Sequence, residues 1–589
     1  MLFRSVEAHE ALAAFHAVGA APVDATLVAH NPLMFAANTL AMTLFGTDTA
    51  TARLPTVLVA VLLIGMPILF RRWLGNVTAL LTSALLAISS VLFMASRTMS
   101  GPVWSMALAL LAVYFVGRFI ETRVPGYALA ATTLLVMLVL MAEPAGFITF
   151  LGLLVGVMFA LASIEDPDNR YRNIASATVR SWPWLRALIT AGIVIGLVST
   201  VFLLYPRGFA TIGELANQAI RGIVTRPADY PFLFPLRASL LYEPLLWLFG
   251  LIGAYQVLTS DEGGLVPFLK RAAVGWLFIS FLASIFYAGA ESSHALWFTL
   301  PLAVLSAATI ERMLMPVRDR FWNVPSWGPW LHGVATLAML LIAGVNLVII
   351  GRAWMMVIAL DRPAADSGVT ARILFEAPAI MLIVITFFLI ASMWGTRAAW
   401  RGLGIGTLAL LCIFSVGTAW RAGVVNADDP REFWQIHPAS RTLNLLEATL
   451  ITASRRATGM PYDVEMVVQP DPQAPADGAL AWALRRFHNA QYVTELAPTI
   501  KPPVMVLPAA IEKPVVGAAY VGQGFSVYNK WEKDELSWDV LAWLYNRSSR
   551  RPPTGDGRVI VWVRNDVYGV SLDTPTTSGA SSSAPGITK

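Results

Sequence analysis

The sequence predicts an all-α membrane protein that crosses the bilayer about twelve times and carries a small α/β domain after its last span. The 589 residues are 56% hydrophobic and only 13% charged, whereas a soluble globular protein is about 25% charged. This composition excludes an ordinary soluble enzyme, a disordered chain and a coiled coil. The single cysteine, Cys412, lies in an apolar run and excludes a disulfide framework or a cysteine-based metal site.

The predicted spans are apolar runs of the length that a bilayer requires. A helix needs about 20 apolar residues to cross about 30 Å of hydrocarbon, and the interiors of these runs carry almost no charge. Several runs are short and could merge or shift by a few residues. We expect spans at 52–70, 76–95, 103–118, 126–142, 145–163, 185–205, 235–258, 273–290, 294–310, 331–350, 377–395 and 403–420.

The loops between these runs predict the orientation of the chain. Every second loop is basic, whereas the opposite set includes the short links 142–144 and 291–293, which contain no Lys or Arg. The positive-inside rule places the basic set in the cytoplasm. The net charge of +5 therefore indicates membrane orientation and no nucleic-acid partner. The basic loops contain Arg71, Arg72, Arg118, Arg123, Arg170, Arg172, Arg180, Arg186, Lys270, Arg271, Arg312, Arg318, Arg320, Arg397 and Arg401.

This orientation places residues 1–51 outside, although neither an apolar segment nor a signal peptide precedes them. We therefore expect that a first helix is missing from the sequence as it begins here. The alternative is a short N-terminal tail that crosses the membrane unaided. The segment 33–45 is apolar but only about 14 residues long, which suits a helix lying along the interface.

The remaining division of the chain follows from the change in composition after residue 420. We expect 1–51 to form an external loop with interfacial helices, 52–420 the transmembrane domain, and 421–570 an extracytoplasmic α/β domain. Within the last domain, strands are expected at 464–468, 504–507 and 559–563, and a helix at 441–455. Residues 571–589 are rich in Ser, Thr, Gly and Pro and read as a disordered tail.

Polar residues on the predicted outer side are the candidates for chemistry. They come from different segments of the chain but share one side of the membrane, so they could converge on one outward-facing cavity. No Walker phosphate loop, HExxH, CxxC or GxSxG motif occurs, which argues against an ATP-driven pump, a zinc protease and a serine hydrolase. No metal-binding motif is found. The candidates are Glu7, Glu10, His30, Arg97, Glu243, Glu291 and His294.

Each candidate also has a plain structural explanation. An acid at Glu7 or Glu10 could simply be solvated, and Arg97 could be an interface anchor whose charged head reaches water. Glu243 lies about eight residues inside a span, where an acid is costly unless it is paired or functional. The link 291–294 could be an ordinary polar loop.

Several short motifs occur in an order and spacing that resemble a known family. They are HNPLMF at 30–35, LFG at 44–46 with ARLP at 52–55, RRWLG at 71–75, ISS at 88–90 with SR at 96–97, LYE at 241–243, and AE at 290–291 followed by Trp297. In this order they are similar to the GT-C membrane glycosyltransferases of the protein O-mannosyltransferase type (family 39). Within that group the chain most resembles the archaeal-flippase-associated glycosyltransferase-like family.

The resemblance implies an enzyme that takes a sugar from a polyprenyl phosphate and passes it to a glycan or protein acceptor outside the membrane. An acid would deprotonate the acceptor hydroxyl, and basic groups would hold the lipid phosphate. It assigns the acid to Glu7, with Glu10 as its substitute, and the phosphate to Arg97. Glu243 and Glu291 would shape the sugar site, and His30 and His294 would contact substrate. No cofactor is implied beyond the lipid-linked sugar itself, and a role for a divalent metal stays open.

The chain departs from the family pattern at three charged positions. The Asp-Glu pair of the family stands here as Val6-Glu7, the later acid falls on Gly101-Pro102, and a lysine falls on Ser292. A non-catalytic relative that binds a lipid-linked glycan or assists its flipping is therefore the alternative function. A transporter is disfavoured, because no internal repeat is found.

Overall fold

A computed structural model describes residues 5–19, 29, 31–140, 144–163, 170–227, 230–260, 265–315, 324–360, 369–471, 478–533, 536, 540, 543, 544, 546, 547 and 551–568. His30 and the tail 571–589 lie outside these residues. The chain divides into two compact units. The membrane unit comprises Met1–Ala439 with Asn529–Thr554, and the C-terminal unit comprises Ser440–Tyr528 with Gly555–Lys589.

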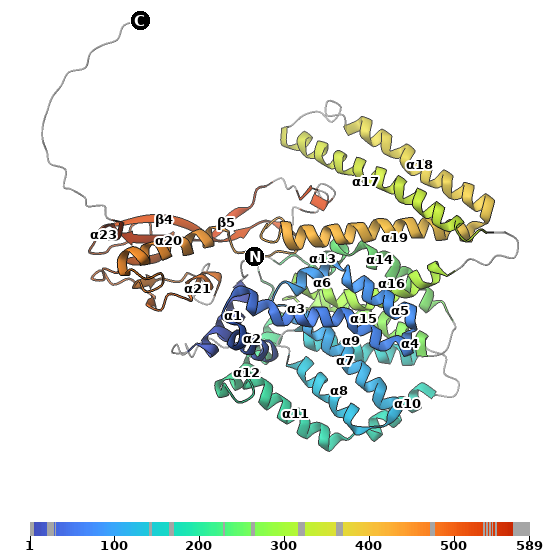
Figure 1. Cartoon of the computed structure of the whole chain (residues 1–589), viewed down its shortest axis with the longest axis horizontal. Helices are drawn as coiled ribbons and strands as arrows, with labels where there is room; N and C mark the ends of the chain where they lie inside the picture. Colours follow the sequence, from blue (N-terminus) through green and yellow to red (C-terminus); the bar gives the residue numbers. More distant parts are fainter. Residues whose placement is uncertain are drawn as a thin grey trace, which may run out of the picture. The chain divides into compact units, whose positions relative to one another are not determined.

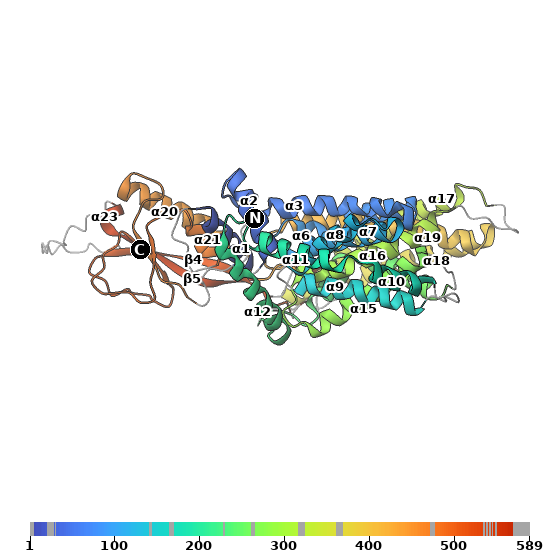
Figure 2. The same cartoon turned by 90° about the horizontal axis from the view of Figure 1, so that it is seen from below.

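The described part of the membrane unit is built from α-helices (Figure 1). Helix α7 packs against α3, α8 and α9, and α15 packs against both α9 and α16 (Figures 1 and 2). The helices are α1 (Ser5–Val18), α2 (Pro32–Phe45), α3 (Thr49–Gly65), α4 (Arg71–Leu74), α5 (Asn76–Ala87), α6 (Ser90–Ser96), α7 (Gly101–Thr122), α8 (Pro125–Val139), α9 (Pro144–Ser163), α10 (Arg170–Ser181), α11 (Trp184–Ser199), α12 (Thr211–Val224), α13 (Phe234–Tyr242), α14 (Pro244–Leu258), α15 (Leu265–Phe286), α16 (Leu296–Leu314), α17 (Gly328–Leu360), α18 (Val369–Trp394) and α19 (Thr396–Trp420).

The helices confirm a polytopic membrane protein. Among the described residues, eight helices are long and apolar enough to cross a membrane, or up to eleven if each bent helix pair forms one span. Every predicted span coincides with one of these helices or pairs, or with the shorter α8. The number twelve itself stays a prediction.

The three bent pairs have identifiable breaks. Helices α5 and α6 meet at 58°, α10 and α11 at 68°, and α13 and α14 at 100°. The last bend falls at Glu243, whose backbone is not helical, and Pro244 opens α14. The ring of a proline crowds the residue before it out of the helical conformation. The sequence Glu-Pro therefore breaks this span and leaves an acid at the break.

Close helix packing in the membrane unit depends on glycine. The backbone of α14 approaches α16, so that hydroxyl groups of α16 bond carbonyl groups of α14: Ser306 to Leu246 at 3.0 Å and Thr309 to Phe249 at 2.9 Å. A Cβ placed on Gly253 would lie 2.4 Å from the carbonyl oxygen of Leu305. Small residues allow such approach between membrane helices.

We expect Gly253→Ala to lower the free energy of unfolding by about 1–3 kcal/mol, the usual penalty for overpacking. The clash is with backbone, which cannot rotate away. Gly192→Ala in α11 is the matched control, because a Cβ there meets nothing within 4 Å. Thermal unfolding of the two purified variants in one detergent checks this. Equal melting temperatures would contradict the proposed close contact.

The C-terminal unit is a small α/β structure, as predicted. Its mixed sheet has the strand order β2-β1-β3-β5-β4, with β1 parallel to β2 and β3, and β3 antiparallel to β5. The strands expected at 464–468, 504–507 and 559–563 correspond to β1, β3 and β5, whereas β2, β4 and α21 were not anticipated. The elements are α20 (Thr442–Thr458), β1 (Met466–Val468), α21 (Ala479–Leu484), β2 (Ala490–Tyr492), β3 (Val504–Pro508), β4 (Tyr520–Lys530), β5 (Thr554–Arg564) and α23 (Asn565–Tyr568).

Candidate functional site

The first group of candidate residues lies around the loop between α6 and α7. The carboxylate of Glu7, on α1, accepts a hydrogen bond from Arg53 on α3, with 2.7 Å between Oε2 and Nη2. Its other oxygen accepts the backbone N–H of Met99 at 3.3 Å. Glu7 is 5% exposed and Arg53 is 8% exposed. One buried carboxylate thus joins α1, α3 and the loop between α6 and α7.

Arg53 is not among the site residues that the sequence predicts. It belongs to the ARLP motif and is the second residue of the first predicted span. A charge inside an apolar run is costly unless it is paired. Its position in the run therefore indicates that Arg53 has a buried acidic partner. Removing one member of a buried ion pair typically destabilises a protein by about 3–5 kcal/mol. The Glu7–Arg53 pair therefore restrains both side chains and links α1 to α3.

Arg97 lies in the same loop as Met99. It follows the last residue of α6 and is partly exposed. Its guanidinium carbon lies 5.5 Å from the ring centroid of Phe93. Within the described residues, its guanidinium makes no ion pair and no hydrogen bond. Because successive Cα atoms are 3.8 Å apart, the backbone of Arg97 lies within about 8 Å of the residue that binds Glu7.

Glu10 lies one turn after Glu7 on α1 and is 5% exposed. Residues three apart on a helix are neighbours on its surface. Both acids of the predicted catalytic pair are therefore buried on one part of α1. The prediction that either could be a simple solvated acid is wrong for this structure.

Glu243 lies at the break between α13 and α14 and is 2% exposed. Ser89 donates a hydrogen bond to its Oε1, and Thr299 donates one to its Oε2 at 2.7 Å. Ser89 is the residue before α6, and Arg97 is the residue after it. Since α6 has seven residues, the two positions lie about 12 Å apart along its axis. Glu243 therefore faces protein and not lipid.

Glu291 and His294 are brought together around the short helix η3 (Ser292–Ala295). The backbone N–H of Glu291 donates to Nδ1 of His294 at 2.8 Å, and the side chain of Glu291 accepts the backbone N–H of His294. Tyr230 also donates to Glu291 at 3.0 Å. Because Nδ1 is an acceptor, the neutral imidazole carries its proton on Nε2. The ring of His294 lies 4.5 Å from that of Trp297.

Six of the seven candidates thus lie in local groups. Glu7, Glu10 and Arg97 lie on α1 and around the α6–α7 loop. Glu243 is bound at the other end of α6, and η3 packs against both α6 and α13. His30 lies outside the described residues. Convergence of all these residues on one outward-facing cavity stays a prediction.

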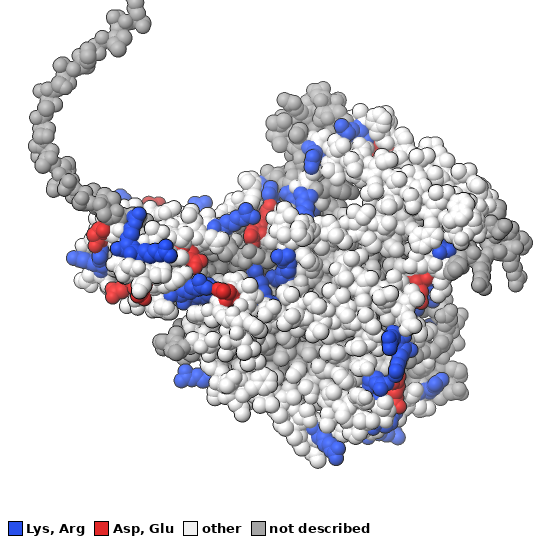
Figure 3. Space-filling model, viewed as in Figure 1, with Lys and Arg blue, Asp and Glu red and all other residues white. Residues whose placement is uncertain are grey.

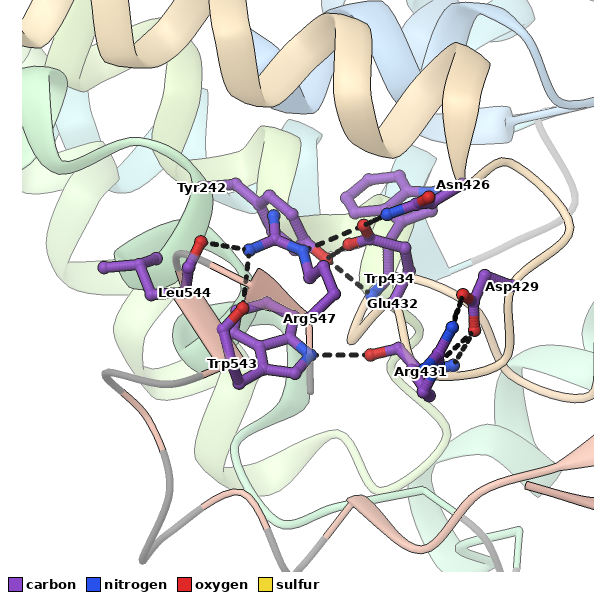
Figure 4. Close-up of polar contacts among 9 residues, drawn as sticks. All are labelled: Tyr242, Asn426, Asp429, Arg431, Glu432, Trp434, Trp543, Leu544 and Arg547. Carbon is purple, nitrogen blue, oxygen red and sulfur yellow. Dashed lines mark hydrogen bonds and ion pairs between the residues drawn. The ribbon is translucent and has the colours of Figure 1, made fainter. Parts of the chain in front are cut away.

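A second buried polar cluster lies beside the Glu243 break and was not predicted (Figure 4). Arg547 and Glu432 form an ion pair with 2.8 Å between Nε and Oε1, and their side chains are 3% and 1% exposed. Tyr242 donates to the other oxygen of Glu432 at 2.9 Å, and Asn426 donates to Oε1 at 3.0 Å. The guanidinium of Arg547 also lies 4.1 Å from the ring centroid of Trp543.

This Glu432–Arg547 cluster explains where the membrane unit ends. The predicted boundary lies between residues 420 and 421, whereas residues 421–439 and 529–554 belong to the membrane unit. The cluster connects these two segments to each other through the Glu432–Arg547 ion pair and to the last residue of α13 through the hydrogen bond from Tyr242 to Glu432. The polar composition of these segments resembles that of an independent domain. No periodic pattern in the sequence indicates that Glu432 pairs with Arg547, 115 residues further along the chain.

No group of three His, Cys, Asp or Glu side chains close enough to hold a metal occurs in the described ranges.

Compared by sequence, the chain matches no protein family profile and no curated protein. Compared by structure, it is similar to ArnT from Cupriavidus metallidurans bound to undecaprenyl phosphate, with 13% identity, 95% of this chain and 94% of that chain covered, and a TM-score of 0.50. The apo state of the same protein gives 12% identity, 95% and 93% coverage, and a TM-score of 0.49. The oligosaccharyltransferase AglB from Archaeoglobus fulgidus, in complex with an inhibitory peptide and a dolichol-phosphate, gives 12% identity, 82% and 62% coverage, and a TM-score of 0.40.

The alignment with the lipid-bound ArnT extends over nearly the whole of both chains. It confirms the GT-C fold predicted from the motifs. It also agrees with the prediction that the chain is a multi-pass membrane protein. The family-39 subtype stays a prediction. A shared fold does not establish a shared reaction, so function has to be argued from the residues of the site.

Proposed function

We propose that this GT-C-fold membrane protein binds a sugar carried on a polyprenyl phosphate and transfers it to a glycan or protein acceptor in the cell envelope. The observation that carries the proposal is the α6–α7 loop. There Arg97 is partly exposed, has no ion pair within the described residues, and precedes by two residues Met99, whose backbone N–H binds Glu7. The cation suits the lipid phosphate, and the buried carboxylate holds the loop that carries this cation.

Arg97 is suited to the phosphate. A guanidinium forms short, charge-assisted and often bidentate hydrogen bonds with phosphate oxygens. Negative charge grows on the phosphate as the sugar leaves, and a fixed cation stabilises that charge. Among the similar structures, ArnT is described as bound to undecaprenyl phosphate, which supports a ligand of this class here.

The contacts of Glu7 favour a positioning role over that of a proton acceptor. Its carboxylate is buried and engaged by Arg53 and by the N–H of Met99, so accepting a proton would weaken a buried ion pair. Glu10 is then the remaining acid on α1. This observation also supports a second candidate function, in which the chain binds a lipid-linked glycan or assists its flipping without catalysis.

The orientation is part of the proposal. We infer that the C-terminal unit lies outside the cell membrane, on the basis of the Lys and Arg distribution. Val515 in that unit is 81% exposed, and Arg397 is an exposed residue in the first turn of α19, on the side predicted to be cytoplasmic. In a Cys412→Ser background, an impermeant maleimide added to intact cells should label Val515→Cys and spare Arg397→Cys. The opposite pattern would overturn the orientation.

The test of lipid-phosphate binding is Arg97→Gln. We expect about 10- to 100-fold weaker binding of a fluorescent polyprenyl-phosphate sugar, because a hydrogen bond to a charged group is worth about 1.5–3 kcal/mol. The matched control is Arg207→Gln, which removes one exposed charge from η2 (Pro206–Ala210) on the same predicted side. Fluorescence polarisation with purified protein in detergent measures both. Binding that is equal for the two variants would remove Arg97 from the site.

A further inference from the structure

A basic groove lies at the end of α7 that is remote from Arg97. Its volume is about 510 Å³, and it is lined by Arg123, Arg170, Asn173, Ile174 and Ala177. Arg123 follows the last residue of α7, and the other four belong to α10. Helix α7 has 22 residues, which corresponds to about 33 Å, close to the thickness of the hydrocarbon core. The groove is therefore about one membrane thickness away from the proposed phosphate site.

The guanidinium of Arg123, which lines the groove, has two contacts of its own. Arg123 adopts a left-handed backbone conformation with φ of 58° as it ends α7. Its Nη1 donates to the hydroxyl of Ser181 at 2.7 Å, and its guanidinium lies 5.7 Å from the ring centroid of Phe119. A guanidinium has five N–H donors, so these contacts fix its orientation and leave donors for a ligand.

The surroundings of the groove are those of a membrane interface. Helix α10 is amphipathic and rich in arginine, and it bends by 68° into the apolar α11. At the bend, Trp184 donates to the carbonyl of Val179 at 3.0 Å, and Leu185 is 73% exposed. Trp at the junction of a polar and an apolar helix is typical of the headgroup level. Figure 3 shows Lys and Arg gathered at the end of the membrane unit where α10 lies in Figure 1.

We propose that this groove binds the phosphate of an anionic phospholipid headgroup in the leaflet at the basic end of the membrane unit. Arg123 and Arg170 supply two guanidinium groups, and the Asn173 amide supplies a further donor. Ile174 and Ala177 form the apolar part of the lining, which suits the glycerol and upper acyl region. A headgroup held here would fix the bend between α10 and α11 at the interface. The inference does not rest on the proposed sugar transfer, because it concerns other residues at the other end of α7.

The experiment measures lipid retention by native mass spectrometry. The purified full chain is incubated in detergent with phosphatidylglycerol, with phosphatidylcholine, or with inorganic phosphate alone. We expect one phosphatidylglycerol to be retained, and both Arg123→Gln and Arg170→Gln to weaken its apparent affinity about tenfold, the equivalent of about 1.4 kcal/mol. Arg172→Gln is the matched control, because it removes an exposed arginine of α10 that does not line the groove. It should change retention less than twofold.

Three results would overturn the proposal. Equal retention of phosphatidylcholine would show that the site does not select charge, and an equal loss in Arg172→Gln would show a diffuse surface effect. Binding of inorganic phosphate as tight as that of the lipid would make this a site for a free anion. Melting temperatures in lipid-free detergent should be the same for all variants, which separates lost binding from lost folding, and the second groove variant repeats the test at an independent position.

Discussion

We expect Arg547→Met to lower the free energy of unfolding of the membrane unit by about 3–5 kcal/mol. The substitution leaves the carboxylate of Glu432, which is 1% exposed on its side chain, in a buried site without its cation. Loss of one member of a buried pair has this magnitude because the remaining charge is uncompensated. Tyr242 and Asn426 still donate to Glu432, but neutral donors do not replace a guanidinium.

Two further variants make this result specific. Arg551→Met is the matched control, because its pair with Glu532 is exposed by 71% and 64%, and an exposed pair contributes only about 0–1 kcal/mol. The double variant Glu432→Gln/Arg547→Met should recover most of the loss, since neither charge of the pair remains. Denaturant titrations followed by tryptophan fluorescence measure all three. If Arg547→Met were no less stable than Arg551→Met, the cluster would not fasten the segments 421–439 and 529–554.

The second large effect concerns turnover. We expect this chain to transfer sugar slowly or not at all, and Val6→Asp to raise turnover about 10²–10⁴-fold, the usual contribution of general acid–base catalysis. The family that the sequence motifs resemble has an acid at this position, and Glu7 is engaged by Arg53 and poorly placed to substitute. Val6→Asn is the matched control, because it has nearly the same shape as aspartate and cannot act as a base.

The assay uses purified protein, a polyprenyl-phosphate sugar, a cell-envelope extract that supplies the glycan and protein acceptors, and mass spectrometric detection of the free polyprenyl phosphate. Glu10→Gln in the unsubstituted chain tests whether Glu10 supports any residual transfer. Robust turnover of the natural sequence that is abolished by Glu7→Gln, with binding and melting temperature retained, would make Glu7 the working acid. No gain in Val6→Asp would favour the non-catalytic function, with Arg97 still binding the lipid phosphate.

The sequence by itself determined the features that depend on local composition. Apolar runs located the membrane helices, because twenty consecutive residues must each tolerate lipid. The Glu243-Pro244 step indicated an acid in a span, and the proline beside it accounts for the bend of 100°. Glu291 and His294 were predicted together because three residues of a tight link cannot separate them. The order of short motifs indicated the GT-C fold.

Only the tertiary structure decided which charges meet. Glu7 and Arg53 are 46 residues apart, Glu432 and Arg547 are 115 apart, and Tyr242 and Glu432 are 190 apart. No periodic pattern marks such partners, because hydropathy records whether a side chain suits lipid or water and not which other side chain it contacts. The folded chain places each of these charges where water is excluded, and a buried charge is stable only beside an opposite charge or hydrogen-bond donors. This requirement is met only when α1, α3, α13 and the segments beyond α19 are packed together. The packing therefore determines the Glu7–Arg53 and Glu432–Arg547 pairs and the end of the membrane unit.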